Sequence, residues 1–205
     1  LIAWRNERLT QVKPSSVLRE MNLLQSVFEA ARKEWRWIAT NPLKDVSKPI
    51  QPTGRKRGVK QSEIDALIAA SGYTEGPPRN QTQMSLLAFL FAIETAMRAG
   101  EILGLTWDTV KPKKVILPKT KNGDSREVPL SPKARSIIDA LRGNDKPFDI
   151  HPGTRDTLFR KLVRAAGVDG LHFHDSRSEA IFRLSKKLDV LELARIIGHR
   201  DINSL

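Results

Sequence analysis

The chain has 205 residues, and 40% of them are apolar, which is enough for a packed core in one large domain or two small ones. Its 35 Lys and Arg residues exceed its 23 Asp and Glu residues by 12, and the excess is concentrated in residues 1–57. This balance favours a polyanionic partner, nucleic acid above all, over an acidic small molecule. No cysteine is present, which excludes disulfides, and four scattered histidines do not predict a zinc site. We therefore expect a cytoplasmic protein without a metal or other cofactor.

Apolar segments do not predict a membrane span. The most apolar run, residues 86–93, is much shorter than the roughly 20 residues that a membrane helix needs, and it is expected to be a buried core helix. No signal peptide opens the chain, and its first residue is Leu1. We expect these residues to be part of a longer protein.

Residues 1–48 predict a small helical module, of which the first part is missing. Residues 1–9 are typical of the end of one helix, and Ser15 or Ser16 is expected to cap the next. Asn41-Pro42 then ends the regular structure. The second helix is predicted from apolar residues at alternating steps of four and three: Val17, Met21, Leu24, Phe28, Ala31, Trp35 and Ile38.

Residues 49–60 predict a linker between two domains. They hold two prolines and two glycines and show no apolar period. Four basic residues accompany them: Arg55, Lys56, Arg57 and Lys60. This run is either a solvated charge cluster or a strap along DNA phosphates.

Residues 61–205 predict a second domain that is mainly helical. A capping signature at Ser62 and Asp65 opens a helix that Gly72 ends, and a helical pattern then continues to about residue 106. Residues 114–117 and 126–130 flank Asn122-Gly123, which predicts a β-hairpin. Further helices are expected after Ser131-Pro132 and Thr154, and a last amphipathic stretch over residues 184–197. The predicted fold class is therefore mainly α with a small antiparallel β-sheet (α+β).

Several cationic residues are candidates for a phosphate site. Arg98 follows the buried helix and precedes Glu101, so the two form either an ordinary ion pair or a phosphate contact oriented by a carboxylate. His174 and Arg177 lie three residues apart and share a face if the segment is helical. His172 alternates with His174, and we expect it to point elsewhere.

Two further candidates lie near turns. Lys121 is predicted at the tip of the hairpin, where its ammonium could donate a proton to a leaving oxygen, and Lys119 is the alternative for this role. His199 follows Gly198 at the end of the last amphipathic stretch, where it is expected to cap a helix. Each of these signals is weak by itself.

Taken in order, the motifs resemble the tyrosine recombinase family, also called phage integrases. They are the arginine of TAMRAGEILGL, a hairpin lysine, the H-x-x-R box with Ser176 where leucine is more usual, and a Gly-His pair. The resemblance implies that residues 61–205 are a catalytic domain and that residues 1–48 belong to a helical core-binding domain. It implies site-specific recombination in the integration or excision of a phage or genomic island.

The resemblance also implies roles for the candidate residues. Arg98 and Arg177 would bind the non-bridging phosphate oxygens, His174 and His199 would support the phosphate and proton transfers, and Lys121 would protonate the leaving oxygen. Glu101 would support the first arginine. The implied partners are double-stranded DNA attachment sites, a homotetramer on DNA, and DNA-bending and excisionase proteins.

The family's nucleophile is not found at its expected place. A tyrosine should follow His199 within about ten residues, beyond Leu205, and the one tyrosine of the sequence, Tyr73, is expected to be a loop or packing residue. We therefore expect these residues to bind DNA without cutting it. The alternatives are a non-catalytic DNA-binding regulator on the same fold and a type IB topoisomerase; a metal-dependent nuclease lacks a close acidic cluster.

Overall fold

A computed structural model describes residues 1–51, 57–118 and 125–198. The chain divides into two compact units, Leu1–Lys56 and Arg57–Leu205. The division falls inside the predicted linker, whereas the domain limits at 48 and 61 remain predictions. Among the described residues, no helix is both long and apolar enough to cross a membrane.

The first unit contains helices α1 (Ile2–Gln11) and α2 (Pro14–Lys33). The prediction of a serine cap for α2 was wrong, because Pro14 occupies the first helical position and Lys13 is the N-cap. The predicted extension to Ile38 was also wrong. The chain leaves the helix after Lys33 and turns through Arg36, whose φ is 56°.

The second unit opens with α3 (Gln61–Ser71), which begins earlier than its predicted cap at Ser62. The reason is Glu63, whose carboxylate accepts a hydrogen bond of 2.9 Å from the backbone N–H of Lys60 and so caps the helix from inside. Gly72 ends α3 in the left-handed conformation, as predicted.

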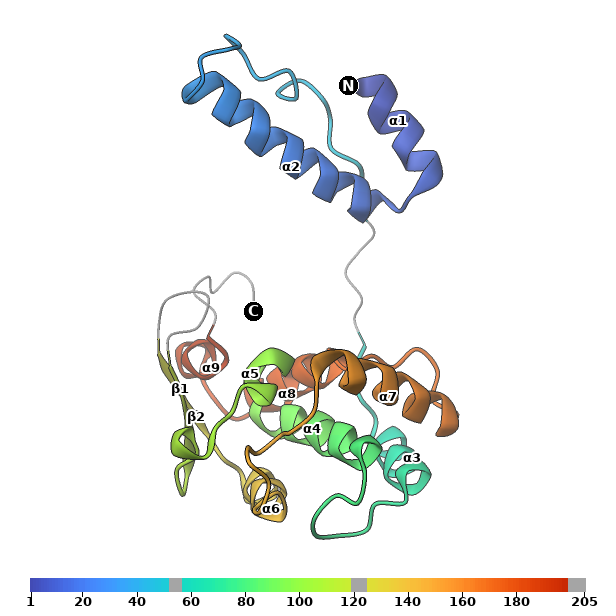
Figure 1. Ribbon diagram of the computed structural model, residues 1–205, viewed down its shortest axis with the longest axis vertical. Helices are drawn as coiled ribbons and strands as arrows, with labels where there is room; N and C mark the ends of the chain where they lie inside the picture. The colour runs from blue at the N-terminus through green and yellow to red at the C-terminus, as the bar shows by residue number, and fades with distance from the viewer. Residues whose placement is uncertain (52–56, 119–124, 199–205) are drawn as a thin grey trace. The chain divides into compact units, whose positions relative to one another are not determined.

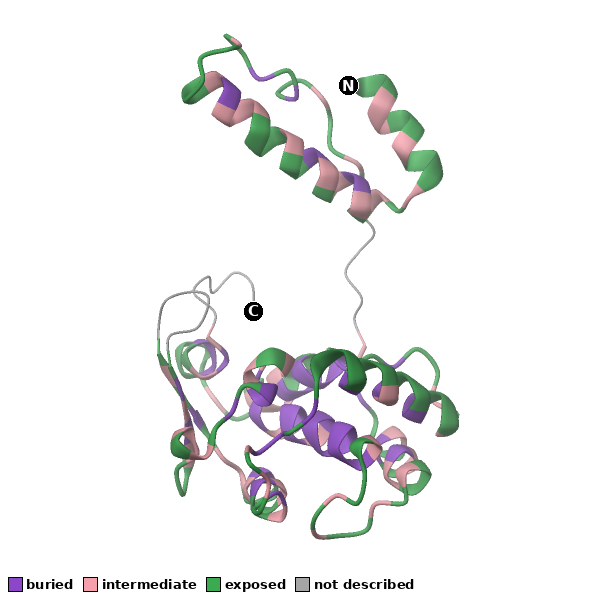
Figure 2. Ribbon diagram, viewed as in Figure 1, coloured by how far each residue is buried: buried purple, intermediate pink, exposed green. Residues whose placement is uncertain are grey.

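Helix α4 (Gln81–Thr95) forms the centre of the second unit (Figure 2). It is apolar on nearly all sides, so it can be stable in water only when other helices cover it. Helices α3, α6 (Pro132–Ala140), α7 (Pro152–Ala165) and α8 (Asp175–Ser185) pack against it. The buried residues of α4 confirm the predicted core helix.

Three aromatic rings join α4 and α7 to the segment before α8. The centroid of the Phe89 ring lies 4.6 Å from that of Phe159 and 5.7 Å from that of Phe173. Edge-to-face contacts such as the one between Phe159 and Phe173 add specific geometry to the burial of apolar area. The cluster fixes the start of α8, where the H-x-x-R box lies.

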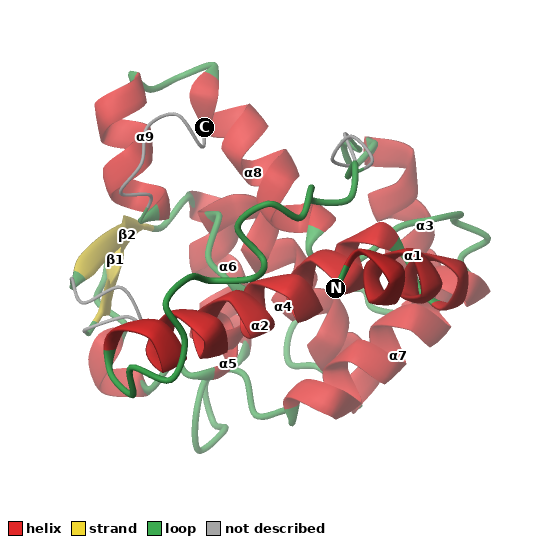
Figure 3. Cartoon of the chain, turned by 90° about the horizontal axis from the view of Figure 1, so that it is seen from above, coloured by secondary structure: helices red, strands yellow, loops and turns green. Residues whose placement is uncertain are grey.

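The described residues of the second unit form a two-stranded sheet, which is a β-hairpin (Figure 3). Strand β1 (Lys114–Leu117) pairs antiparallel with β2 (Arg126–Pro129), with Val115 opposite Val128. A short helix α5 (Ala99–Leu103) and a 3-10 turn η1 (Trp107–Thr109) connect α4 to β1. The predicted fold class is confirmed: helices dominate, and the described residues add a two-stranded antiparallel sheet.

The predicted last amphipathic stretch, residues 184–197, covers the end of α8 and the whole of α9 (Val190–Ile197). Helix α8 ends at Ser185, and α9 begins after Asp189, whose carboxylate accepts hydrogen bonds from the first turn of α9. Helix α7 likewise begins at Pro152, before the predicted Thr154 cap, because the His151 side chain accepts from the N–H of Gly153.

Candidate active site

Arg98 reaches the surface because α4 ends in an abrupt turn. Ala96 adopts a left-handed conformation with φ of 52°, which is uncommon outside glycine and turns the chain away from the helix axis. Arg98 then becomes the N-cap of α5, and its side chain is 40% exposed. The turn thus presents a guanidinium at the edge of the core.

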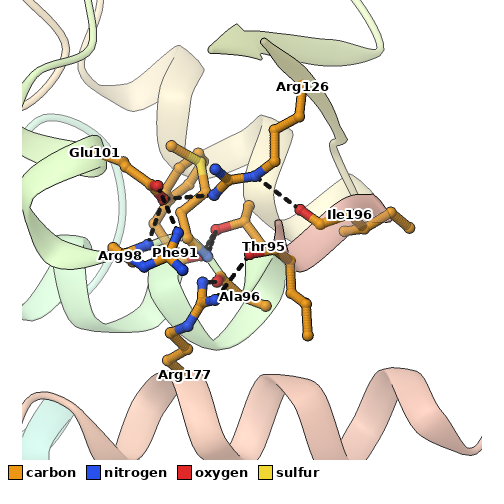
Figure 4. A network of polar contacts seen from close by, with 10 residues as sticks. Phe91, Thr95, Ala96, Arg98, Glu101, Arg126, Arg177 and Ile196 are labelled. Atoms are coloured by element: carbon orange, nitrogen blue, oxygen red, sulfur yellow. Dashed lines mark hydrogen bonds and ion pairs between the residues drawn. The ribbon is translucent and has the colours of Figure 1, made fainter. Parts of the chain in front are cut away.

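Glu101 holds Arg98 through two contacts. Its carboxylate accepts a hydrogen bond of 2.8 Å from the backbone N–H of Arg98 and one of 3.0 Å from the Nη1 of the same residue. Arg126, on β2, donates from Nη2 to the same carboxylate at 2.6 Å (Figure 4). Burial alone would raise the pKa of Glu101, but the hydrogen bonds from Arg126 and Arg98 outweigh it and lower that pKa.

Arg177, on α8, is 5% exposed and is held by backbone carbonyls. Its Nη1 donates to the carbonyl of Ala96, and its Nη2 donates to that of Ile197 at 2.8 Å. Burial lowers the pKa of Arg177 to about 10, assisted by the charge of Arg98 and opposed by that of Glu101. The guanidinium is therefore still protonated at neutral pH.

Arg98, His174 and Arg177 line one open cavity of about 580 Å³. His174 is the exposed N-cap of α8, and Arg177 lies in the first turn of that helix, as the three-residue spacing predicted. His172 lines the same cavity, so the prediction that it points elsewhere was wrong. Alternation applies to an extended strand, whereas this segment turns into α8.

Sequence reasoning missed two arginines of this region. Arg155, on α7, also lines the cavity, and its guanidinium carbon lies 4.0 Å from the centre of the Phe173 ring. No pattern signals it, because an arginine in a helix is expected to face water. Arg126 could have been found, since it shares a face of β2 with Val128, which is fully buried.

Other predicted site residues lie outside the described residues. Lys121 and its alternative Lys119 belong to the segment between β1 and β2, and His199 follows Gly198. Arg55 and Lys56 fall in the first gap of the description. Their assignments stay predictions.

The described part of the linker divides into two kinds of residue. Arg57 donates to Glu63 at 2.5 Å and to the carbonyl of Asp169 at 2.9 Å, so it anchors the chain to its own unit. Lys60 is exposed. A strap along DNA phosphates can use Lys60 directly, whereas Arg57 has to give up its hydrogen bonds to Glu63 and Asp169 first.

Tyr73 is a packing residue. Its hydroxyl donates to the carbonyl of Gly76 at 2.8 Å, its ring packs against the core, and burial raises its pKa. No group of three or more His, Cys, Asp or Glu side chains suited to a metal ion occurs among the described residues.

Comparison with known proteins identifies the family. The model of the phage integrase family matches residues 57–205, and the chain belongs to that family. An integrase/recombinase of Haemophilus influenzae is 45% identical, over 98% of this chain and 57% of that protein. The shufflon-specific DNA recombinase of Escherichia coli is 37% identical, over 100% of this chain and 55% of its own length. The chain thus spans little more than half the length of these two relatives.

Solved structures show the same fold. Lambda integrase, as a dimer bound to a COC′ core site, matches 99% of this chain and 78% of its own, with a TM-score of 0.78 and 18% identity. The integrase of the Tn1549 transposon, in complex with circular intermediate DNA, matches 98% of this chain and 77% of its own, with a TM-score of 0.74 and 16% identity.

Proposed function

We propose that the chain is the phosphate-binding part of a site-specific recombinase that cleaves and rejoins DNA strands through a 3′-phosphotyrosyl intermediate. The observation that carries this proposal is the convergence of Arg98, His174 and Arg177 on one cavity. Family membership and relatives named as recombinases support it.

In the proposed reaction the two arginines stabilise the transition state. A tyrosine oxygen attacks a DNA phosphorus, the bond from phosphorus to the 5′ oxygen breaks, and negative charge grows on the non-bridging oxygens. Guanidinium groups that are already fixed in place can stabilise this charge without reorganising. Arg177 suits this role because two backbone carbonyls hold its guanidinium in place where it lines the cavity.

Proton transfer falls to the lysine and the histidines. We assign Lys121 as the acid that protonates the departing 5′ oxygen, with His174 and His199 supporting the phosphate and the proton transfers. A 5′ hydroxyl from a partner strand then attacks the phosphotyrosine and releases the tyrosine. Cationic side chains provide the charge stabilisation in every step.

The nucleophile of this proposal lies outside the 205 residues. Tyr73 cannot serve, because its hydroxyl is bound to Gly76 and it lines a different cavity from Arg98 and Arg177. We propose that these residues alone bind DNA without cleaving it. The intact protein is proposed to act as a tetramer on double-stranded attachment sites, assisted by DNA-bending and excisionase proteins.

Trapping of a covalent complex tests the function. The chain, extended by the coding sequence that follows it, should form a detergent-resistant adduct with DNA that carries its attachment site. Arg177→Ala should abolish the adduct and leave most DNA binding, because one buried side chain contributes little to the total phosphate contact. Relaxation of supercoils without exchange between two sites would instead favour the topoisomerase. Binding without any adduct would favour the regulator.

A further inference from the structure

Arg126 connects three parts of the site without reaching its surface. Its side chain is 8% exposed, at the first position of β2. The Nη2 atom donates to Glu101 at 2.6 Å, and the Nε atom donates to the carbonyl of Ile196 at 3.0 Å (Figure 4). One guanidinium therefore joins the hairpin, the N-terminus of α5 and the last turn of α9.

Glu101 is shared between a buried arginine and a half-exposed one. Arg126 satisfies the carboxylate from the core side, while Arg98 approaches it with its side chain 40% exposed. If Arg98 were the only partner of the Glu101 carboxylate, the carboxylate would neutralise the charge of Arg98. With Arg126 supplying a second positive charge, the cluster of Arg98, Glu101 and Arg126 keeps a net charge of +1, which an incoming phosphate can use.

Two guanidiniums, those of Arg126 and Arg177, hold the end of α9. Helix C-termini leave carbonyls without intrahelical partners, and these carry partial negative charge. Here the carbonyl of Ile196 accepts from Arg126, and that of Ile197 accepts from Arg177. Gly198 follows with φ of 68°, and a Cβ at this position would lie 3.0 Å from Nη1 of Arg126.

We propose that Arg126 is a positioning residue: it neutralises Glu101 from the buried side so that Arg98 stays available to phosphate, and it fixes the last turn of α9. The first half of the inference rests on the proposed function, because it concerns binding of DNA phosphate. The second half concerns the fold alone.

Measurements of DNA affinity test the role of Arg126 toward Arg98, with variants of matched net charge. In anisotropy titrations of a fluorescent DNA duplex, Arg126→Met should weaken binding about tenfold, although the Arg126 side chain is only 8% exposed. Combining it with Glu101→Gln should restore most of the affinity, since Gln keeps an acceptor for Arg98 but no charge. Combining it with Glu127→Gln gives the same net charge, and the half-exposed Glu127 side chain pairs with Lys114 on the neighbouring strand. That control should not restore affinity.

Amide hydrogen exchange tests the second half without any ligand. The N–H of Gly198 donates to the carbonyl of Ala194 at 2.9 Å. It should exchange at least tenfold faster in Arg126→Met than in the wild-type chain. Arg126→Lys, which keeps the charge but cannot reach both acceptors, should keep DNA affinity and still speed this exchange. This variant also serves if Arg126→Met does not fold.

Each outcome decides one of the two halves. Equal affinity of the two double variants would overturn the role of Arg126 toward Arg98. Unchanged exchange at Gly198 would overturn its role toward α9. If the wild-type chain binds no duplex, the proposed function fails, and the exchange rates still decide whether Arg126 holds α9.

Discussion

Arg98 and Arg177 face the same cavity but are fixed by different acceptors. Arg98 pairs with a carboxylate, so its charge is partly balanced before any ligand arrives. Arg177 pairs with two neutral carbonyls, so its full charge remains. Burial of that charge is costly, which the lowered pKa of Arg177 reflects. In the proposed function a phosphate would offset this cost, so we expect Arg177 to bind the anion more strongly than Arg98.

The proposed role of Lys121 as proton donor can be tested by the rate of strand cleavage. In the intact protein, Lys121→Ala should slow strand cleavage, because the 5′ oxygen leaves poorly without a proton. DNA with a sulfur in place of the bridging 5′ oxygen should cleave at a nearly normal rate in this variant, since a thiolate leaves without protonation. Single-turnover cleavage rates on the two substrates measure the effect. If Lys119→Ala alone shows the rescue, the proton donor is Lys119.

Helix α9 ends at Gly198, which lies close to the Arg126 side chain. Gly198→Ala should destabilise the fold by roughly 1–2 kcal/mol through its left-handed conformation, plus a further cost from the close approach of Arg126. Gly72→Ala is the matched control, because Gly72 ends α3 with φ of 63° and has open space around its Cβ position. Urea unfolding of both variants measures the difference. Equal losses of unfolding free energy in the two variants would mean that the Arg126 side chain moves away from the new Cβ without a loss of stability.

Acid should loosen the turn after α2. Hydrogen bonds from Arg32 and Asn41 lower the pKa of Glu29 to about 2, well below its usual value. A lowered pKa in the folded state means that the contribution to stability is present above about pH 4.5 and is lost as the pH falls toward 2. The buried side chain of Asn41, which binds Glu29 at 3.0 Å, should then become mobile. Side-chain NMR of Asn41 should show this transition in the wild type, whereas Glu29→Gln should remove its pH dependence.

Local patterns predicted the elements that depend on neighbouring residues. The apolar run predicted α4, and the turn signal Asn122-Gly123 between two short strand-like segments predicted β1 and β2. Patterns failed where distant groups decide the outcome. The contacts of Arg126 with Glu101 and Ile196 join residues that lie far apart in the sequence but next to one another in the fold. The arginine and histidine motifs could be read in order, but their partners could not.

Net charge gives a prediction for the DNA binding that is proposed for this chain. The chain carries a formal charge of +12, so its affinity for DNA should fall steeply as salt rises. If the linker follows the phosphates, Lys60→Ala should lower the slope of log affinity against log salt by about one. Arg57→Ala should leave the slope unchanged and lower the melting temperature, because Arg57 is engaged by Glu63 and Asp169. The opposite pattern would place Arg57 on the DNA.

Three of the contacts that hold Arg126 and Arg177 end on main-chain oxygens, at Ala96, Ile196 and Ile197. A point mutation exchanges a side chain but leaves the carbonyl in place, provided that the backbone keeps its path. The arginine contacts at these three positions therefore do not depend directly on the side chain present, although Ala96 and Ile197 are themselves fully buried in the core. Contacts of this kind can outlast changes of sequence that keep the backbone in place, and solved structures keep the fold of this chain at TM-scores of 0.74 to 0.78 with only 16% to 18% identity.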